Sequence, residues 1–371
     1  MTDMANPVPP LAILLELTHR CPLQCLYCSN PLQLRGASAE LTTQDWFRVL
    51  DQAADLGILQ VHFSGGEPAA RRDLTILVAH ARERGLYSNL ITSGIAITRD
   101  RLAELAKAGL DHVQLSFQDT DPESAERINN YPGSQNRKLE FARWVRDLSL
   151  PLTVNAVVHR QNIARVEAMI ELALELGAAR VEVAHVQYYG WALLNRDALM
   201  PSLDQLREAT RKVEAARQRL RGRIVIDYVI PDYYARQPKA CMGGWGRQFL
   251  NVTPDGKVLP CHAAETIPDM EFDSVKDAPL AEIWRNSDAF RRFRGVDWMP
   301  EPCRSCDQRE VDWGGCRCQA LAVTGSAAAT DPACALSPWN GTLRQMAFDA
   351  SAVPVPTLRY RRIKQPASAS A

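Results

Sequence analysis

Cysteine is the residue whose spacing carries the most chemical information in this chain. Three of the ten cysteines lie at positions 21, 25 and 28, and the other seven lie between 241 and 334. Thiolates bind soft metals and iron–sulfur clusters, whereas disulfides are typical of secreted proteins. Residues 11–15 are apolar but too short for a secretion signal, and they lack a basic flank and a cleavage site. The sequence therefore predicts a cytoplasmic protein with metal-binding cysteines.

The first cluster, Cys21, Cys25 and Cys28, follows directly after the first predicted strand. In a parallel α/β sheet, ligands bind at the C-terminal ends of the strands. Three thiolates can hold three irons of a [4Fe–4S] cube and leave the fourth iron open, which is a catalytic arrangement. A zinc site is the alternative, for which His19 would supply the fourth ligand.

The second cysteine region has little regular periodicity and is rich in Cys, Gly, Pro and Trp from residue 238 onward. Such a segment cannot build an ordinary core, so we expect metal sites to stabilise it. Its residues with metal-ligand chemistry are Cys241, Cys261, Cys303, Cys306, Asp312, Cys316, Cys318 and Cys334. Spacing alone would group residues 303, 306, 316 and 318 into a zinc-ribbon-like site.

The elements that position the first cluster alternate between strands and helices. Short apolar segments predict strands at 11–18, 60–64, 87–92, 112–117, 152–159 and 180–187. Helical patterns that end at glycine separate several of them, which indicates a parallel sheet in an α/β fold. Six such units are too few for a closed eight-stranded barrel, so an open barrel and a doubly wound sheet are both possible.

The expected division of the chain follows these changes in pattern. A flexible arm at 1–10 precedes an α/β core at 11–222, a bridging strand and linker at 223–240, the cysteine-rich domain at 241–345 and a flexible tail at 346–371. Lys+Arg and Asp+Glu both number 43, which gives no reason to expect a nucleic-acid or anionic-membrane partner. No apolar run is long enough for a membrane span.

The segment Cys21-Pro-Leu-Gln-Cys25-Leu-Tyr27-Cys28 resembles the CxxxCxxC signature of the radical S-adenosylmethionine (SAM) superfamily. Ser64-Gly65-Gly66-Glu67-Pro68 resembles the GGE motif of the same family. The resemblance implies a partial (β/α)6 TIM-like barrel with a [4Fe–4S] cluster whose open iron binds SAM. It also implies that Tyr27 lies near the adenine and that Gly65, Gly66 and Glu67 hold the methionine ammonium, since glycine lets the backbone approach a ligand closely.

Polar residues near later strand ends resemble family elements that contact the rest of SAM. These residues are Thr92, Ser93, Ser116, Gln118 and Asn155. The resemblance implies contacts with the sulfonium, carboxylate, ribose and adenine. Each residue could instead cap a strand end.

The second cysteine region resembles the SPASM domain, which carries two auxiliary iron–sulfur clusters, [4Fe–4S] or [2Fe–2S], in peptide-modifying radical SAM enzymes. The resemblance implies two interleaved ligand sets: Cys241, Cys261, Cys316 and Cys318 for one cluster, and Cys303, Cys306, Asp312 and Cys334 for the other. Asp312 departs from the pattern, which has Cys at this position. A carboxylate is a harder ligand than a thiolate and would change the potential of its cluster.

The aromatic stretch 182–196, Asp312 and the Cys316-Arg317-Cys318 triplet together resemble the peptide cyclases of pyrroloquinoline quinone (PQQ) biosynthesis. That family joins a Glu side chain to a Tyr ring within a small precursor peptide (PqqA). A peptide chaperone (PqqD) and an electron donor such as flavodoxin are the further partners that this resemblance implies.

A base is needed for the proton of the Tyr ring, and His185, Tyr188 and Tyr189 are the candidates. Histidine is favoured by its pKa, although His185 could equally be a hydrogen-bonding core residue. Two other functions are left open. One is another SPASM enzyme, such as a thioether-forming synthase or a sulfatase-maturing enzyme, and the other is an iron–sulfur electron carrier without SAM chemistry.

Overall fold

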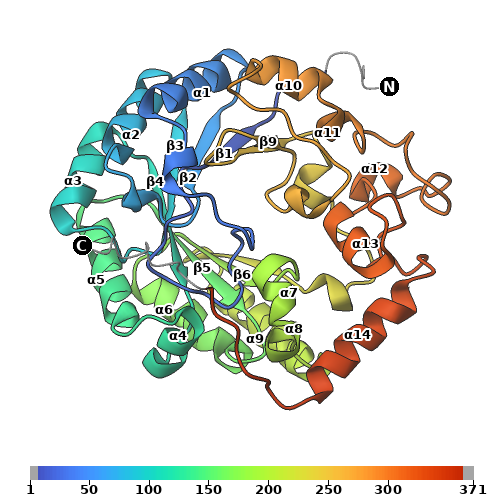
Figure 1. Cartoon of the computed structure of the whole chain (residues 1–371). Coiled ribbons are helices and arrows are strands. Elements are labelled where there is room, and N and C mark those ends of the chain that lie inside the picture. The colour runs from blue at the N-terminus through green and yellow to red at the C-terminus, as the bar shows by residue number, and fades with distance from the viewer. Residues whose placement is uncertain (1–6, 362–371) are drawn as a thin grey trace, which may run out of the picture.

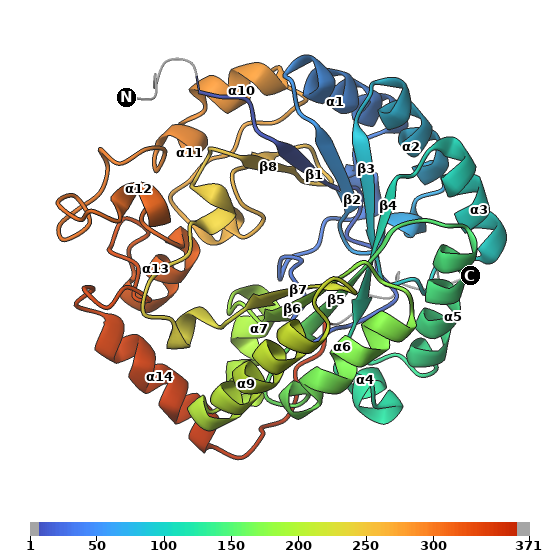
Figure 2. The ribbon, with the colours of Figure 1, turned by 180° about the vertical axis from the view of Figure 1, so that it is seen from behind.

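A computed structural model describes residues 7–361, and its centre is a curved sheet of nine strands (Figures 1 and 2). The strands are β1 (Ala12–Glu16), β2 (Gln60–Ser64), β3 (Tyr87–Thr92), β4 (His112–Phe117), β5 (Leu152–Val158), β6 (Arg180–His185), β7 (Val225–Val229), β8 (Phe249–Val252) and β9 (Val258–Leu259). The six strands predicted for the core are β1–β6, and each pairs in parallel with its neighbour in sequence. The α/β fold with a parallel sheet is confirmed.

The strand order decides between the two architectures that the sequence left open. It runs β7-β6-β5-β4-β3-β2-β1-β8-β9, without the reversal that a doubly wound sheet has. Right-handed crossovers in one continuous direction place every helix on the same face of the sheet. Figures 1 and 2 show these helices on the outside of the curved sheet, so the fold is an open, TIM-like barrel.

The helices of the barrel are α1 (Thr43–Asp55), α2 (Leu74–Glu83), α3 (Arg99–Ala108), α4 (Pro122–Asn129), α5 (Ser134–Asp147), α6 (Val166–Glu175), α7 (Gly190–Leu194), α8 (Arg196–Leu199) and α9 (Leu203–Arg219). Their apolar stripes pack on alternate strand residues, such as Val61 and Phe63 of β2, which are fully buried. The intervening residues of each strand, such as His62, face the barrel interior and are partly exposed. Local signals set the helix ends: Thr42 and Asp45 form a capping box at the start of α1.

Three strands extend the sheet beyond the six predicted for the core. β7 pairs in parallel with β6, so residues 225–229 of the predicted linker belong to the barrel sheet. β8 pairs in parallel with β1 on the opposite edge, and β9 returns antiparallel to β8. The cysteine-rich domain therefore shares a continuous sheet with the barrel.

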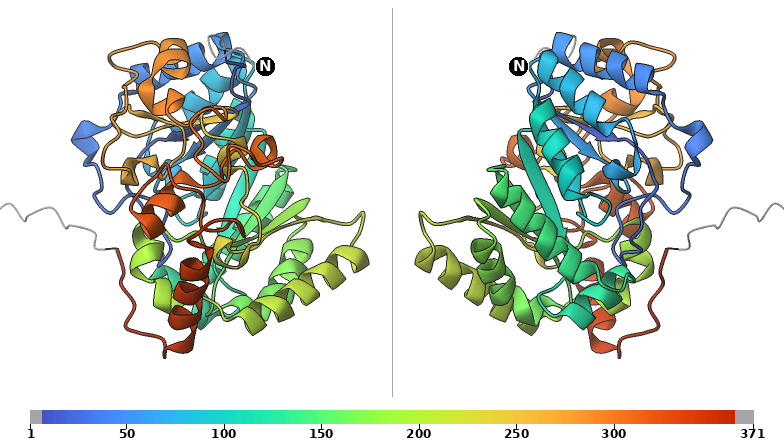
Figure 3. Two further views of the ribbon diagram at one scale, coloured as in Figure 1. Left: turned by 90° about the vertical axis from the view of Figure 1, so that its right-hand side faces the viewer. Right: turned by 90° about the vertical axis from the view of Figure 1, so that its left-hand side faces the viewer.

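The cysteine-rich domain lies across the open side of the barrel, as the side views show (Figure 3). Its helices are α10 (Leu280–Asn286), α11 (Asp288–Arg291), α12 (Arg309–Asp312), α13 (Arg317–Thr324) and α14 (Asn340–Ala352). A small apolar cluster around Trp245, Phe293 and Trp298 supports it, with ring centroids 5.4 and 5.0 Å apart.

Both expected flexible ends differ from the structure within the described residues. The Val8 carbonyl accepts a hydrogen bond from Trp284 Nε1 at 3.2 Å, so the backbone at Val8 is attached to α10. Helix α14 continues to Ala352, and Arg361 is buried. Residues 1–6 of the expected arm and 362–371 of the expected tail lie outside the described residues. In the part from 7 to 361, every helix is too short or too polar to cross a bilayer.

Candidate cofactor sites

Cys21, Cys25 and Cys28 lie on the loop that follows β1, at the C-terminal edge of the sheet. Their thiols are free and half-buried. Burial raises the pKa of all three, that of Cys25 to about 12. Such thiols lose their protons at neutral pH only when a metal or another positive charge stabilises the thiolate.

The backbone of this loop is fixed by α4, a helix that the sequence did not predict. Gln24 N donates to Asn129 O at 2.8 Å, and Leu26 N donates to Ile128 O at 3.1 Å. Leu26 is fully buried. The loop therefore has a defined shape that comes from protein contacts alone.

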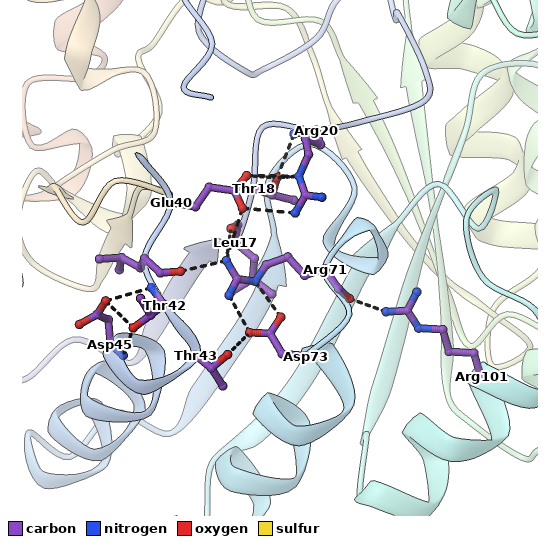
Figure 4. A network of polar contacts seen from close by, with 11 residues as sticks. Leu17, Thr18, Arg20, Glu40, Thr42, Thr43, Asp45, Arg71, Asp73 and Arg101 are labelled. Atoms are coloured by element: carbon purple, nitrogen blue, oxygen red, sulfur yellow. Dashed lines mark hydrogen bonds and ion pairs between the residues drawn. The ribbon is translucent and has the colours of Figure 1, made fainter. Parts of the chain in front are cut away.

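A polar network holds the entry to the loop (Figure 4). Thr18 Oγ1 donates to Glu40 Oε1 at 2.5 Å, and Arg20 Nη2 lies 3.3 Å from Glu40 Oε2. The buried Arg71 donates from Nη1 to Leu17 O at 3.4 Å and to Leu41 O at 3.0 Å. These contacts connect the end of β1 to the segments that follow β2 and precede α1.

Gly65 and Gly66 are required by the protein's own backbone. A Cβ atom at Gly65 would lie 2.4 Å from Thr18 O, and one at Gly66 would lie 2.5 Å from Arg20 O. Gly66 N donates to Thr18 O at 2.6 Å, and Glu67 N donates to Arg20 O at 2.8 Å. The two glycines thus let the GGE segment pack directly on the cysteine loop, and their contact with a ligand stays a prediction.

Glu67 is completely buried and is held from both sides by the end of β3. Thr92 Oγ1 donates to Oε1 at 2.7 Å, and Ser93 N donates to Oε2 at 2.9 Å. Ala69 N donates to Oε1 at 3.3 Å. Thr92 and Ser93 therefore orient the Glu67 carboxylate, and their own contact with a ligand stays a prediction.

Lys138 on α5 is a functional candidate that the sequence reasoning missed. It is completely buried, and Nζ donates to Ser116 O at 2.6 Å and to Gln118 Oε1 at 2.7 Å. Burial lowers its pKa from 10.5 to about 8, while nearby Cys25 acts in the opposite direction. Gln118 Nε2 in turn donates to Tyr27 Oη at 3.2 Å. The structure thus brings Ser116, Gln118 and Tyr27 together around a buried cation close to the cysteine loop.

Asn155 faces the barrel interior from β5. Its Nδ2 donates to Glu182 Oε2 at 2.9 Å, and Gln114 Nε2 donates to the same oxygen at 3.1 Å. Burial raises the pKa of Glu182. Asn155 Oδ1 is buried and has no hydrogen-bond partner among the described residues. Since a buried acceptor without a partner is costly, this oxygen is suited to accept a hydrogen bond from a bound molecule.

Four cysteines of the second region come together. They lie on the short 3-10 helix Cys241–Gly243, just after the end of β9 and at the start of α13. They are Cys241, Cys261, Cys316 and Cys318. Each of the four thiols changes the pKa of two others, Cys241 those of Cys261 and Cys316, and Cys318 those of the same two, so the four side chains are neighbours. These four cysteines are the set that the SPASM resemblance implies for one cluster. They differ from residues 303, 306, 316 and 318, which spacing alone would group into a zinc-ribbon-like site.

The remaining three cysteines and Asp312 line a single pocket. They are Cys303, Cys306 and Cys334. Burial raises the pKa of Asp312, and a hydrogen bond from Gly314 N to Oδ1 at 2.9 Å offsets part of this effect. Asp331 also lines the pocket, but its carboxylate accepts from Cys316 N at 2.6 Å and Ala333 N at 2.8 Å. Asp312 is therefore the carboxylate with more remaining acceptor capacity.

His185 does not face the barrel interior. It lies three residues after Glu182 on β6, so the two side chains point to opposite faces of the sheet. Its Nε2 lies 3.4 Å from Tyr228 Oη, which also contacts Thr210 of α9 at 2.9 Å. Burial lowers the pKa of His185 to about 3. Its surroundings are those of a core residue, the second of the two roles considered for it.

Tyr188 and Tyr189 have different surroundings although they are adjacent. The Tyr188 ring packs edge-on against Tyr233 at 5.0 Å in an apolar cluster. Tyr189 is partly exposed and its hydroxyl is hydrogen-bonded to His262 Nε2. Burial raises the pKa of Tyr189, and Cys261 and Cys28 contribute in the same direction, so Tyr189 lies between the two cysteine regions.

Comparisons with known proteins agree with this arrangement. Residues 15–173 match the radical SAM superfamily, and residues 241–307 match SPASM, an iron–sulfur cluster-binding domain. The chain is therefore a radical SAM enzyme whose second region is an iron–sulfur domain and not a zinc ribbon.

It is 58% identical over 360 residues to a PqqA peptide cyclase of Granulibacter bethesdensis, covering 97% of this chain and 96% of that protein. A PqqA peptide cyclase of Rhodopseudomonas palustris is 64% identical over 330 residues, with 89% and 88% covered. The chain belongs to the PqqA peptide cyclase family.

Solved structures share the fold at low sequence identity. Streptococcus suis SuiB bound to S-adenosylmethionine has a TM-score of 0.73 at 20% identity, covering 88% of this chain and 77% of that one. Native anSMEcpe with bound AdoMet has a TM-score of 0.66 at 16% identity, covering 92% and 96%. The similarity supports the barrel and its cysteine-rich domain as one architecture.

The residues at the C-terminal edge of the barrel fit a cluster and SAM. Three thiols share one loop, with the Glu67 carboxylate and the Lys138 ammonium buried nearby. SAM carries an ammonium and a carboxylate on its methionine part, and the two side chains have the complementary charges. Asn155 Oδ1 adds a buried acceptor without a partner in the described residues.

Proposed function

We propose that this enzyme is a PqqA peptide cyclase, which joins a Glu and a Tyr side chain of the precursor peptide PqqA in the first step of PQQ biosynthesis. The observation that carries the proposal is the near-complete match to proteins of that name at 58% and 64% identity. The reaction forms one carbon–carbon bond. It removes one hydrogen from the Glu side chain and one from the Tyr ring, so two electrons and two protons leave the peptide.

In this proposal, Cys21, Cys25 and Cys28 hold a [4Fe–4S] cluster, and its open iron binds SAM. When bound, this pair supplies an electron and a carbon radical able to abstract hydrogen. Glu67 accepts from the methionine ammonium and is kept in place by Thr92 and Ser93, as their hydrogen bonds support.

Lys138 is proposed to donate to the methionine carboxylate. Its ammonium has three donors, of which Ser116 O and Gln118 Oε1 take two, so one is left for a ligand. Asn155 Oδ1 is proposed to accept from a ribose hydroxyl, and Tyr27 to lie against the adenine, with Gln118 fixing the Tyr27 hydroxyl.

The two auxiliary clusters are proposed to use separate ligand sets. One set is Cys241, Cys261, Cys316 and Cys318, supported by the effect of each thiol on the pKa of its neighbours. The other is Cys303, Cys306, Asp312 and Cys334, supported by their common pocket. Each cluster is [4Fe–4S] or [2Fe–2S], and both are suited to accept the electron that the oxidative reaction releases.

Among the three candidate bases, we assign Tyr189 as the group that accepts the proton of the substrate Tyr ring. His262 is its hydrogen-bonded partner. The hydrogen bond between Tyr189 Oη and His262 Nε2 gives the hydroxyl a neutral acceptor to which its own proton can pass. Burial lowers the pKa of His262 and so favours its neutral form, which can accept a proton. Tyr188 packs in an apolar cluster and His185 is buried beside the Tyr228 hydroxyl, and both are assigned structural roles.

The partners follow from the same proposal. PqqD is proposed to present the precursor peptide, and flavodoxin or a similar protein to supply the electron. The protein reconstituted with iron and sulfide, given SAM, a reductant and PqqA, should yield 5′-deoxyadenosine and a peptide lighter by two hydrogens. Tandem mass spectrometry should place the new bond between Glu and Tyr.

Controls separate the alternatives. PqqA in which the reacting Tyr is replaced by Phe should not be crosslinked, whereas a thioether-forming enzyme would require a peptide Cys. Cys25→Ala should abolish 5′-deoxyadenosine formation. Formation of 5′-deoxyadenosine without any change in PqqA would contradict the assigned substrate, and no 5′-deoxyadenosine at all would favour an electron carrier.

A further inference from the structure

The chain following α14 returns to the cysteine loop of the barrel. Figure 1 shows this segment, in dark red, running from α14 to the centre of the barrel. Arg359 N donates to Asn195 Oδ1 at 2.8 Å, and Asn195 Nδ2 donates back to Arg359 O at 2.9 Å. Tyr360 Oη donates to Arg127 O at 2.7 Å. Residues 359 and 360 are thus fixed to two different parts of the barrel.

The next residue, Arg361, has only 1% of its side chain exposed. Its guanidinium donates to three main-chain oxygens of one short segment: His19 O at 3.3 Å, Cys21 O at 3.1 Å and Leu23 O at 2.6 Å. The guanidinium is planar and rigid, so these three carbonyl oxygens can all accept from it only in a narrow range of loop conformations. The contact therefore specifies the conformation of the loop that carries the first cysteine.

The charge of Arg361 also acts on the thiols. Its partners are neutral carbonyls, so no carboxylate cancels the charge. The guanidinium donates to the main-chain oxygen of Cys21 and to oxygens on either side of it, so its charge lies close to the first thiol. A positive charge at this position favours thiolate over thiol, and it favours a more reduced cluster over a more oxidised one.

We propose that Arg361 is a positioning residue, which clamps the Cys21 loop in its cluster-binding shape and stabilises the negative charge of the N-terminal cluster. The C-terminal segment is then a working part of the cofactor site. This inference rests on the assignment of Cys21, Cys25 and Cys28 as cluster ligands.

The clamp is tested first in the cofactor-free full-length protein. Arg361→Gln removes the charge and the fork, and Arg361→Lys keeps the charge alone. Arg359→Gln is the matched control, because Arg359 is exposed and uses only its backbone. Hydrogen exchange measured by mass spectrometry should be about ten-fold faster in residues 18–28 of both Arg361 variants. Exchange at the wild-type rate in Arg361→Gln would overturn the clamp.

The charge is tested in the reconstituted protein. Redox titration followed by electron paramagnetic resonance should give a lower midpoint potential for the SAM-responsive cluster in Arg361→Gln than in Arg361→Lys or Arg359→Gln. Equal potentials in all proteins would overturn the electrostatic part of the proposal. If Arg361→Gln does not fold, Arg361→Lys still tests the clamp.

Failure of the ligand assignment has a different signature. Cys25→Ala that retained the full iron content and the SAM-responsive signal would remove the assignment. The exchange rates of residues 18–28 would still decide whether Arg361 holds the loop.

Discussion

Replacing Lys138 by Met is expected to stabilise the cofactor-free protein and to weaken SAM binding. Lys138 is completely buried, and burial lowers its pKa from 10.5 to about 8. At pH values between about 8 and 10.5, Lys138 keeps its proton in the unfolded chain and loses it in the folded chain. Keeping the lysine charged at pH 7 therefore costs about 3 kcal/mol, because one pKa unit corresponds to 1.36 kcal/mol.

Methionine is similar in length, fills the same space and carries no charge. It leaves Ser116 O without the lysine donor, at a cost of about 1 kcal/mol, while Gln118 Oε1 still accepts from Asn129 Nδ2 at 3.1 Å. The free energy of unfolding should thus rise by about 2 kcal/mol at pH 7. The gain should shrink as the pH rises from 8 toward 10.5, where the wild-type lysine is neutral in both states.

Urea unfolding of the anaerobic, cofactor-free protein measures this gain, with Lys107→Met as the control. Lys107 is exposed near the end of α3, so its replacement should change the stability by less than about 0.5 kcal/mol. In the reconstituted protein, loss of the charged donor should weaken SAM binding by about 10- to 100-fold in equilibrium dialysis.

The two effects of Lys138→Met have opposite signs, which makes the reasoning easy to refute. A variant that is less stable than the wild type at pH 7 would show that the charge is not a cost in the empty site. Unchanged SAM affinity with the expected stability gain would leave Lys138 as a core residue without a ligand role.

Three further predictions concern other parts of the site. Gly66→Ala places a Cβ 2.5 Å from a main-chain oxygen and should cost at least about 2 kcal/mol in unfolding, whereas Gly36→Ala, with no atom within 4 Å, should cost little. Asp312→Cys should keep the iron content and lower the midpoint potential of one auxiliary cluster in a redox titration; an unchanged potential would contradict ligation. Tyr189→Phe should leave 5′-deoxyadenosine formation intact and slow crosslinking at least about ten-fold, a loss that Tyr188→Phe should not share.

Most of the barrel could be predicted because its signals are local. The strands alternate buried and interior residues, and the helices carry apolar stripes that end at glycine, as α3 does at Gly109. The pairing of β8 with β1 could not be predicted, since Leu11 N and Gln248 O meet across more than 230 residues. The sheet that joins the two domains therefore depends on contacts that no short window of sequence contains.

The same distinction applies to the site. Cysteine spacing indicates the ligand loops, because thiols at those intervals have little other use. Lys138 follows Arg137 on a helix that looks polar and solvent-exposed, and only the packing of α5 on β4 buries it. The orientation of His185 could have been predicted from the sequence. It lies three positions after Glu182 on a strand, and alternate strand residues point to opposite faces.

Three buried cations accompany the three cysteine sites, and each is held by neutral carbonyl oxygens. Lys138 and Arg361 lie beside the first loop, and Arg317, 1% exposed, donates to Ala327 O at 3.0 Å and Ala329 O at 2.9 Å between the other two sites. Among residues 7–361, none of the three forms an ion pair with a carboxylate. A buried charge is costly unless an opposite charge compensates it. Carbonyls hold these cations without neutralising them, and Glu67 near Lys138 and Asp331 near Arg317 supply only part of the compensating charge. We expect the thiolates and their clusters to supply the rest, so the cofactor-free protein bears that cost until the clusters bind.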